Sequence, residues 1–398
     1  MITCKDYDGL TVLHHASRDG NTSVARFLTE LHPYNFIDLK DCQGRNVLHH
    51  AVLSECTSTV ETVLQHLNVC DGKDKEGLTP LHYAIRQGNK DIVDALLKTN
   101  ASVALFDKSG RVALHHVAQG TNNQSEIAKT LLKCHSEIEV YDLRGATPLH
   151  YAAKSGLCDL IELLVNHGAD INCLDINEET PLHYAVKANK AEVVETLLLK
   201  GSNPQITNIY GKLAVDYTLS PNEENIKEKL LSLTKSASFE QEDGLKLLQA
   251  ARQNNVHEAR SLLKKGVFVN YCDLKGTTPL HSSTKSGHFE TTQLLLETGG
   301  AVNVKDKRGK TPLHYAVEGR FAELVDLLIS NGAVVNAKDN VKRTPLSNLL
   351  SSCTAEAQSE IFQMDKKLMN ENIERTDVQN KTPLHYALQS NSPEIVQM

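Results

Sequence analysis

The sequence of 398 residues contains no tryptophan, and aromatic residues make up only 5% of it. Because each buried aromatic side chain contributes about 150–250 Å² of buried area, this scarcity disfavours one large, thick core. The charged fraction of 23% is ordinary, which excludes a disordered polyelectrolyte. The composition therefore predicts a thin structure that buries small aliphatic side chains repeatedly along the chain.

Long apolar runs are also absent, and no stretch approaches the roughly 20 residues that a membrane span needs. The first residues, Met1 to Asp6, lack the apolar segment of a signal peptide. Nine cysteines include no CxxC pair, which disfavours a zinc or redox site and favours a reducing compartment. We therefore predict a cytoplasmic protein, with the nucleus as the alternative location, and no insertion of this chain into a membrane.

The motifs of common enzymes are missing as well. The sequence contains no HExxH, GxSxG, GxxxxGK[ST] or GxGxxG. The net charge of −7 argues against general binding to nucleic acid. We predict that these residues carry no enzyme activity, no cofactor and no metal.

A short motif recurs throughout the chain instead. The hexad Thr-Pro-Leu-His-Tyr-Ala begins at Thr79, Thr147, Thr180, Thr311 and Thr382. Looser copies begin at Thr11, Asn46, Val112, Thr278 and Thr344, and two eroded copies begin at Leu213 and Leu245. The usual period is 33 residues, so about twelve units fill the chain.

Each unit carries signals for a turn followed by two helices. Asp or Asn stands five residues before eleven of the twelve hexads and is typical of turn starts. Glycine usually follows three residues later, where it fits a positive φ. Threonine then serves as helix cap and proline as the first helical residue. A second amphipathic stretch follows, for example 159–165, so we predict thin helical units that are stable only when stacked.

This pattern resembles the ankyrin repeat family, for which a 33-residue period and a T-P-L-H-x-A motif are typical. The resemblance covers essentially the whole chain. It implies an all-α solenoid of helix-turn-helix units with β-hairpin-like finger loops. We number the repeats by their hexads and call the five residues before hexad n finger n.

The repeats fall into two predicted blocks, repeats 1–7 in residues 1–236 and repeats 8–12 in residues 237–398. The segment 220–242 lacks the finger signature, and the unit beginning at Leu245 resembles the opening of a fresh array. The last repeat is incomplete, and about five extra residues precede Thr382. Because both ends lack a polar capping unit, we expect the sequence to be a piece of a longer protein.

Histidine is abundant, with 18 residues, but nine of these occupy the fourth position of the hexad. Periodicity explains them without catalysis or metal binding. We predict that they make a structural hydrogen bond near the base of the finger.

The family resemblance implies that partners bind through the finger tips and the inner ends of the first helices. At these positions the sequence has more cations than anions, although the whole chain is acidic. A basic groove would attract an acidic or phosphorylated segment of another protein. The predicted contact residues, densest in repeats 9–11, are Arg144, Lys154, Tyr210, Lys275, Lys285, Lys307, Arg308, Lys310 and Arg343, with Lys305, Lys338 and Lys342 beside them. The alternative is that these cations are family consensus without a binding role.

A second implication of the resemblance concerns asparagine hydroxylation after the second helix. Asn172, Asn270, Asn303 and Asn336 occupy that position. The alternative is a structural asparagine that bonds the next finger, and both roles can hold together.

The leading functional hypothesis is a non-catalytic protein-interaction scaffold or adaptor. The alternative is the cytosolic ankyrin portion of a larger effector, such as an ion channel, kinase, acyltransferase or ubiquitin ligase. A third hypothesis is a secreted microbial or viral effector that imitates host scaffolds. The sequence alone identifies neither the partner nor the oligomeric state.

Overall fold

The computed structural model describes residues 4–31, 39–66, 70–120, 123–134, 137–218, 226–227, 230, 237–273 and 275–351. Regular structure in these ranges is entirely helical, without a β-strand. The predicted all-α class is therefore confirmed. The chain divides into two compact units, Met1–Leu163 and Leu164–Met398.

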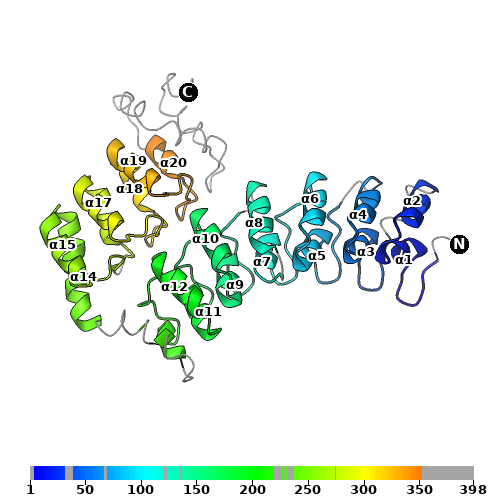
Figure 1. The fold of residues 1–398 in the computed structure, drawn as a ribbon, viewed down its shortest axis with the longest axis horizontal. Coiled ribbons are helices and arrows are strands. Elements are labelled where there is room, and N and C mark those ends of the chain that lie inside the picture. The colour runs from blue at the N-terminus through cyan, green and yellow to red at the C-terminus, as the bar shows by residue number, and fades with distance from the viewer. Residues whose placement is uncertain are drawn as a thin grey trace, which may run out of the picture. The chain divides into compact units, whose positions relative to one another are not determined.

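Unit 1 repeats one pattern in which a first helix packs against a second helix and against the next first helix (Figure 1). The first helices are α1 (Val12–Arg18), α3 (Val47–Leu53), α5 (Pro80–Gln87), α7 (Ala113–Val117) and α9 (Pro148–Ser155). The second helices are α2 (Thr22–Leu31), α4 (Thr57–Leu64), α6 (Lys90–Lys98), α8 (Gln124–Lys133) and α10 (Cys158–Asn166), which continues into unit 2.

Unit 2 follows the same pattern on both sides of its irregular seventh repeat. Repeat 6 and the start of repeat 7 form α11 (Pro181–Lys187), α12 (Ala191–Leu199) and the 3₁₀ turn η1 (Ala214–Tyr217). The later helices are α14 (Ala237–Arg252), α15 (Val256–Lys264), α16 (Pro279–Lys285), α17 (Phe289–Glu297), α18 (Pro312–Glu318), α19 (Ala322–Ser330) and α20 (Pro345–Ser351).

The two eroded hexads form different structures from the intact ones. The copy at Leu213, which lacks Thr and Pro, begins a single 3₁₀ turn. The copy at Leu245 lies inside the 16-residue helix α14, as its helical sequence predicted. The division into blocks at residue 236 stays a prediction, because 231–236 lie outside the described residues. The hexad at 382–387 and residues 352–372 also lie outside them.

The intact hexads begin helices through a reciprocal cap. In repeat 9 the Thr278 backbone N–H donates to His281 Nδ1 (3.2 Å), and the His281 N–H lies 3.4 Å from Thr278 Oγ1. Pro279 follows as the first helical residue. Two of the helix's otherwise unsatisfied amides thereby find a partner, which fixes where α16 begins.

We expect the Thr278→Ala variant to lose about 1 kcal/mol of unfolding free energy, because the cap acceptor disappears. Chemical denaturation followed by circular dichroism measures this loss. The neighbouring Thr277→Ala variant is a matched control, since the Thr277 side chain makes no hydrogen bond to a described residue. Equal effects of the two substitutions would contradict the role of the cap.

The fingers are hydrogen-bonded turns rather than pairs of strands. In finger 10 the Asp306 N–H donates to the Lys310 carbonyl (3.0 Å), and Asp306 Oδ1 accepts the N–H groups of Arg308 and Lys310 at 2.8 and 2.9 Å. Gly309 has φ +76°, and a Cβ there would lie 2.6 Å from the Asn340 nitrogen. Glycine thus permits both the turn and the close approach of the next finger.

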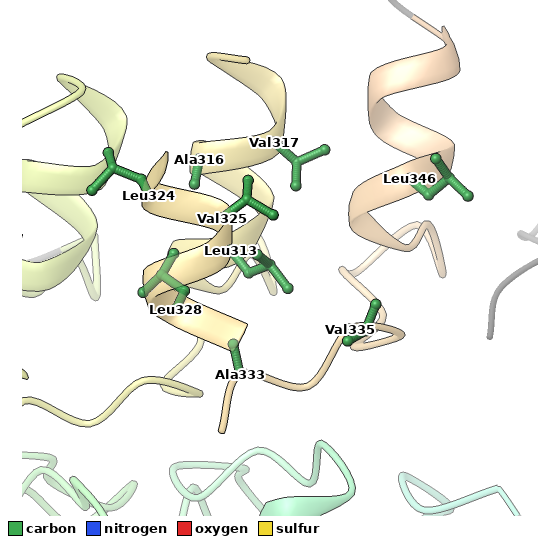
Figure 2. Packing of buried hydrophobic residues seen from close by; sticks show 9 residues of the cluster. All are labelled: Leu313, Ala316, Val317, Leu324, Val325, Leu328, Ala333, Val335 and Leu346. Carbon is green, nitrogen blue, oxygen red and sulfur yellow. The ribbon is translucent and has the colours of Figure 1, made fainter. Parts of the chain in front are cut away.

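The core consists of small aliphatic clusters that pack the two helices of a repeat together and reach the next repeat, as Leu346 of α20 does. In unit 2, Leu313 and Ala316 of α18 pack with Leu324, Val325 and Leu328 of α19 (Figure 2). All five side chains are at most 2% exposed. Burial of leucine, alanine and valine at each step explains how the chain folds with so few aromatic residues.

Candidate partner-binding surface

In most described repeats a side-chain hydrogen bond holds the finger over its own first helix. In repeat 10 the Tyr315 hydroxyl donates to Asp306 Oδ2 (2.6 Å), nine residues earlier. The same spacing joins Tyr83 to Asp74 and Tyr184 to Asp175, both at 2.8 Å. We call this bond the finger strap. The finger strap was not predicted above, although the constant spacing of nine residues between the aspartate and the tyrosine is a sequence signal for it.

In repeats 9 and 10 the histidine of the hexad anchors the base of the next finger. His281 Nδ1 accepts the Thr278 N–H, so its Nε2 carries the hydrogen and donates to the Lys310 carbonyl (3.0 Å). His314 makes the equivalent bond to the Arg343 carbonyl (3.2 Å). Burial lowers the pKa of His314 to about 4, so this ring is neutral at pH 7. The predicted structural hydrogen bond is confirmed for the described hexad histidines, whereas His385 lies outside the described residues.

Direct bonds between neighbouring fingers then fix fingers 9, 10 and 11 relative to one another. The Lys307 N–H donates to the Lys275 carbonyl (2.9 Å), and the Asn340 N–H donates to the Arg308 carbonyl (3.0 Å). Asn340 Nδ2 also donates to the Lys307 carbonyl (2.9 Å). The finger tips are therefore presented at set spacings rather than as independent loops.

Four exposed cations lie on these three linked fingers, and we call them the basic finger strip: Lys275, Lys307, Arg308 and Lys342. None of the four forms an ion pair within the described part of the chain. Lys342 has φ +59°, at the position where finger 10 has Gly309. A non-glycine residue in this left-handed region is uncommon and costs backbone strain.

The other three predicted residues of repeats 9–11 lie in different environments. Lys310 is half-buried and forms an ion pair with Glu318, so its charge is largely neutralised. Lys285 is exposed at the end of α16, with its Nζ 5.5 Å from the centre of the Tyr315 ring. Arg343 is half-buried. Lys285 therefore extends the basic finger strip, whereas Lys310 contributes little free charge.

The remaining predicted residues belong to other repeats. Arg144 and Lys154 are exposed in unit 1, and an Arg144 guanidinium N–H donates to the Tyr151 hydroxyl (2.9 Å). Tyr210 lies in finger 7 of unit 2 and is 69% exposed. Unit 2 thus contains seven of the nine predicted contact residues.

Comparison with known proteins decides the family. The family described as "Ankyrin repeats (3 copies)" matches residues 2–73, 61–142, 114–208, 222–306 and 247–339. The chain belongs to the ankyrin repeat family. Ankyrin repeats generally mediate protein–protein interaction, so this module is suited to protein partners.

Two further comparisons accompany this result. A search of curated proteins finds no match. Among solved structures, the ankyrin repeat domain of Bcl-3, described as a unique member of the IkappaB protein family, is similar. The two sequences are 24% identical over 56% of this chain and 99% of that one, with a TM-score of 0.49.

The asparagines after the second helices of these ankyrin repeats bond the following repeat. Asn172 Oδ1 accepts the Asn203 N–H (2.8 Å), Asn270 Oδ1 accepts the Ala301 N–H (2.7 Å), and Asn303 Oδ1 accepts the Val334 N–H (2.8 Å). The structural role is therefore confirmed at these three positions, whereas the residue that Asn336 would bond lies outside the described residues. Hydroxylation stays a prediction.

Metal sites and membrane spans are both absent from the described ankyrin repeats. No group of three His, Cys, Asp or Glu side chains there could hold a metal ion. None of the helices in the same ranges has the length and apolar character needed to cross a membrane.

Proposed function

We propose that this ankyrin chain is a non-catalytic scaffold or adaptor whose second unit binds an acidic or phosphorylated segment of a partner protein. The binding surface is the basic finger strip, with Lys285 beside it. The observation that carries the proposal is the set of exposed cations on three mutually bonded fingers without a described acidic partner.

The charges of unit 1 are arranged differently, which argues against a purely consensus origin for the strip. In fingers 3 and 4, Lys108 Nζ lies 3.8 Å from Glu76 Oε1, so neighbouring tips carry opposite charges. Fingers 9–11 have no acidic side chain at their tips that could pair with these cations. Their positive potential is available to attract an anionic segment from solution.

A triple charge reversal tests the proposal. We expect K275E/K307E/R308E to weaken capture of partner proteins from a native lysate by at least about 10-fold, because three attractive contacts become repulsive. Quantitative affinity capture with mass spectrometry measures the loss. Raising the salt concentration should weaken capture by the wild type in parallel.

A control of equal charge separates this surface from net charge alone. The R260E/K264E/K265E variant makes the same change on exposed residues in and just after the second helix α15. It should retain partner recovery. Recovery of the same partners by wild type and by the finger variant would reject the strip as the binding surface.

A further inference from the structure

Neighbouring repeats meet through a pair of rings at their first helices. The hexad histidine of one repeat packs edge-on against the residue at the fifth hexad position of the next repeat. Four such pairs are histidine–tyrosine: His49–Tyr83, His115–Tyr151, His183–Tyr217 and His281–Tyr315, with ring centres 5.5–6.3 Å apart. We call the contact between repeats n and n+1 joint n/n+1.

Two joints of unit 1 pair histidine with histidine instead. The rings of His14 and His50 are 5.2 Å apart at joint 1/2, and those of His82 and His116 are 4.7 Å apart at joint 3/4. All four side chains belong to residues that are at most 1% exposed. Each of these joints therefore buries two histidine rings in contact, whereas a histidine–tyrosine joint contains one.

At joint 1/2 the hydrogen bonds are those of two neutral rings. His14 Nδ1 accepts the Thr11 N–H (3.1 Å), and its Nε2 donates to the Leu39 carbonyl (3.0 Å). His50 Nε2 donates to Asp41 (2.9 Å), while its buried Nδ1 has no hydrogen-bond partner among the described residues. A proton on Nδ1 would find no acceptor. The charged groups around this pair are Asp41, Lys5, Arg18 and Arg45.

At joint 3/4 a second proton on the His116 ring would face a hydrogen-bond donor instead of an acceptor. His116 Nε2 donates to Asp107 (3.1 Å), and its Nδ1 accepts from Arg86 Nε (3.1 Å). A proton on Nδ1 would oppose the Arg86 N–H. His82 Nδ1 accepts the Thr79 N–H (3.0 Å), and its buried Nε2 lacks a partner in the described chain. The charged groups around this pair are Asp107, Arg86, Arg111 and Lys73.

Burial has the largest effect on all four rings and lowers their pKa values, while the finger aspartates Asp41 and Asp107 oppose it. Desolvation lowers the pKa of His14 and of His82 to about 4, against an ordinary value of 6.5. It also lowers the pKa of His50 and His116, to which the neighbouring arginines contribute. These rings bind protons readily only after the repeats separate.

We propose that joints 1/2 and 3/4 are proton-sensitive hinges, each releasing two histidines to protonation when its repeats separate, whereas a histidine–tyrosine joint releases one. Above pH 6.5 the rings are neutral in both states and stability is unaffected. As pH falls from 6.5 to about 4, the open state binds more protons than the closed state. Each such histidine raises the opening constant by about 10-fold per pH unit in this window.

The hexad itself supplies the matched test variant, His50→Tyr. Tyrosine at the equivalent position, Tyr83, keeps the bond to the finger aspartate at 2.8 Å. The substitution removes no other hydrogen bond, because His50 Nδ1 has none to a described residue. The reverse variant, Tyr151→His, creates a histidine–histidine joint between repeats 4 and 5.

Native-state hydrogen exchange of the full chain, corrected for intrinsic rates, measures opening from pH 7.5 to 4.5. Between pH 7.5 and 5, protection of α1 and α3 should fall by at least about 10-fold more in wild type than in H50Y. The Y151H variant should steepen the pH dependence around α7 and α9. Equal pH dependence in wild type and H50Y would overturn the proposal. If H50Y does not fold, an unchanged dependence in Y151H would overturn it.

Discussion

The Leu313→Ala variant should unfold with a free energy about 3 kcal/mol below that of the wild type. Leu313 is fully buried between α18 and α19, with Val325 and Leu328 against it. Removing its side chain loses the transfer free energy and leaves a cavity, since neighbouring repeats relax only in part. Urea denaturation followed by circular dichroism measures the change.

A substitution at an exposed finger position is the control for the Leu313→Ala variant. Val341 is 45% exposed, so Val341→Ala should change the unfolding free energy by no more than about 0.5 kcal/mol. Leu313→Met keeps the volume and should cost less than about 1.5 kcal/mol. A loss for Leu313→Ala as small as that of Val341→Ala would show that the cluster does not support this part of unit 2.

The second large effect is expected at the finger strap of repeat 2. Asp41 Oδ1 accepts the Gln43 and Arg45 N–H groups at 2.8 and 2.9 Å, and Oδ2 accepts from Arg45 Nε (2.8 Å) and His50 Nε2 (2.9 Å). Asp41→Ala leaves all four donors without their acceptor. We expect a loss of about 3 kcal/mol in unfolding free energy, measured by the same denaturation.

The pH dependence of this loss follows from the carboxylate. Burial by itself would raise the pKa of Asp41, but bonds from the Arg45 backbone and from the His50 and Arg45 side chains lower it to about 2. The contribution of Asp41 is therefore complete above pH 3.8 and disappears as pH falls through 2. Asp41→Ala should stay less stable throughout pH 5–8. Asp8→Ala, at an exposed finger tip, should have little effect.

Much of the fold could be predicted from the sequence because its signals are local and repeated. The threonine cap, the proline that follows it and the finger glycine each act within a few residues, and the structure places all three as expected in repeat 10. The 3₁₀ turn at Ala214–Tyr217 is understandable afterwards, since repeat 7 lacks that cap. The boundary of the compact units, within α10, has no such local signal.

The binding surface was harder to predict because it depends on which cations form ion pairs. That pairing depends on how close the end of each first helix lies to its own finger. Lys310 and Lys307 look equivalent in the sequence, yet Lys310 pairs with Glu318 and Lys307 stays exposed. Arg144 similarly turns back to Tyr151. The finger strap and the histidine–histidine joints were missed for the same reason, since both depend on contacts in space between hexads.

The bonds that tie one repeat to the next have a nearly constant separation along the chain. His49 reaches the Leu78 carbonyl 29 residues on, Asn270 reaches Ala301 31 residues on, and Lys40 reaches the Lys73 carbonyl 33 residues on. These groups thus find their partners in the adjacent copy. Removing residues 74–106 would join Lys73 to Asp107 and leave each remaining finger beside a finger of the same kind. Gene duplication and deletion can therefore change the length of such an array while the hydrogen bonds that join one repeat to the next are kept, and the residues at the finger tips can vary independently.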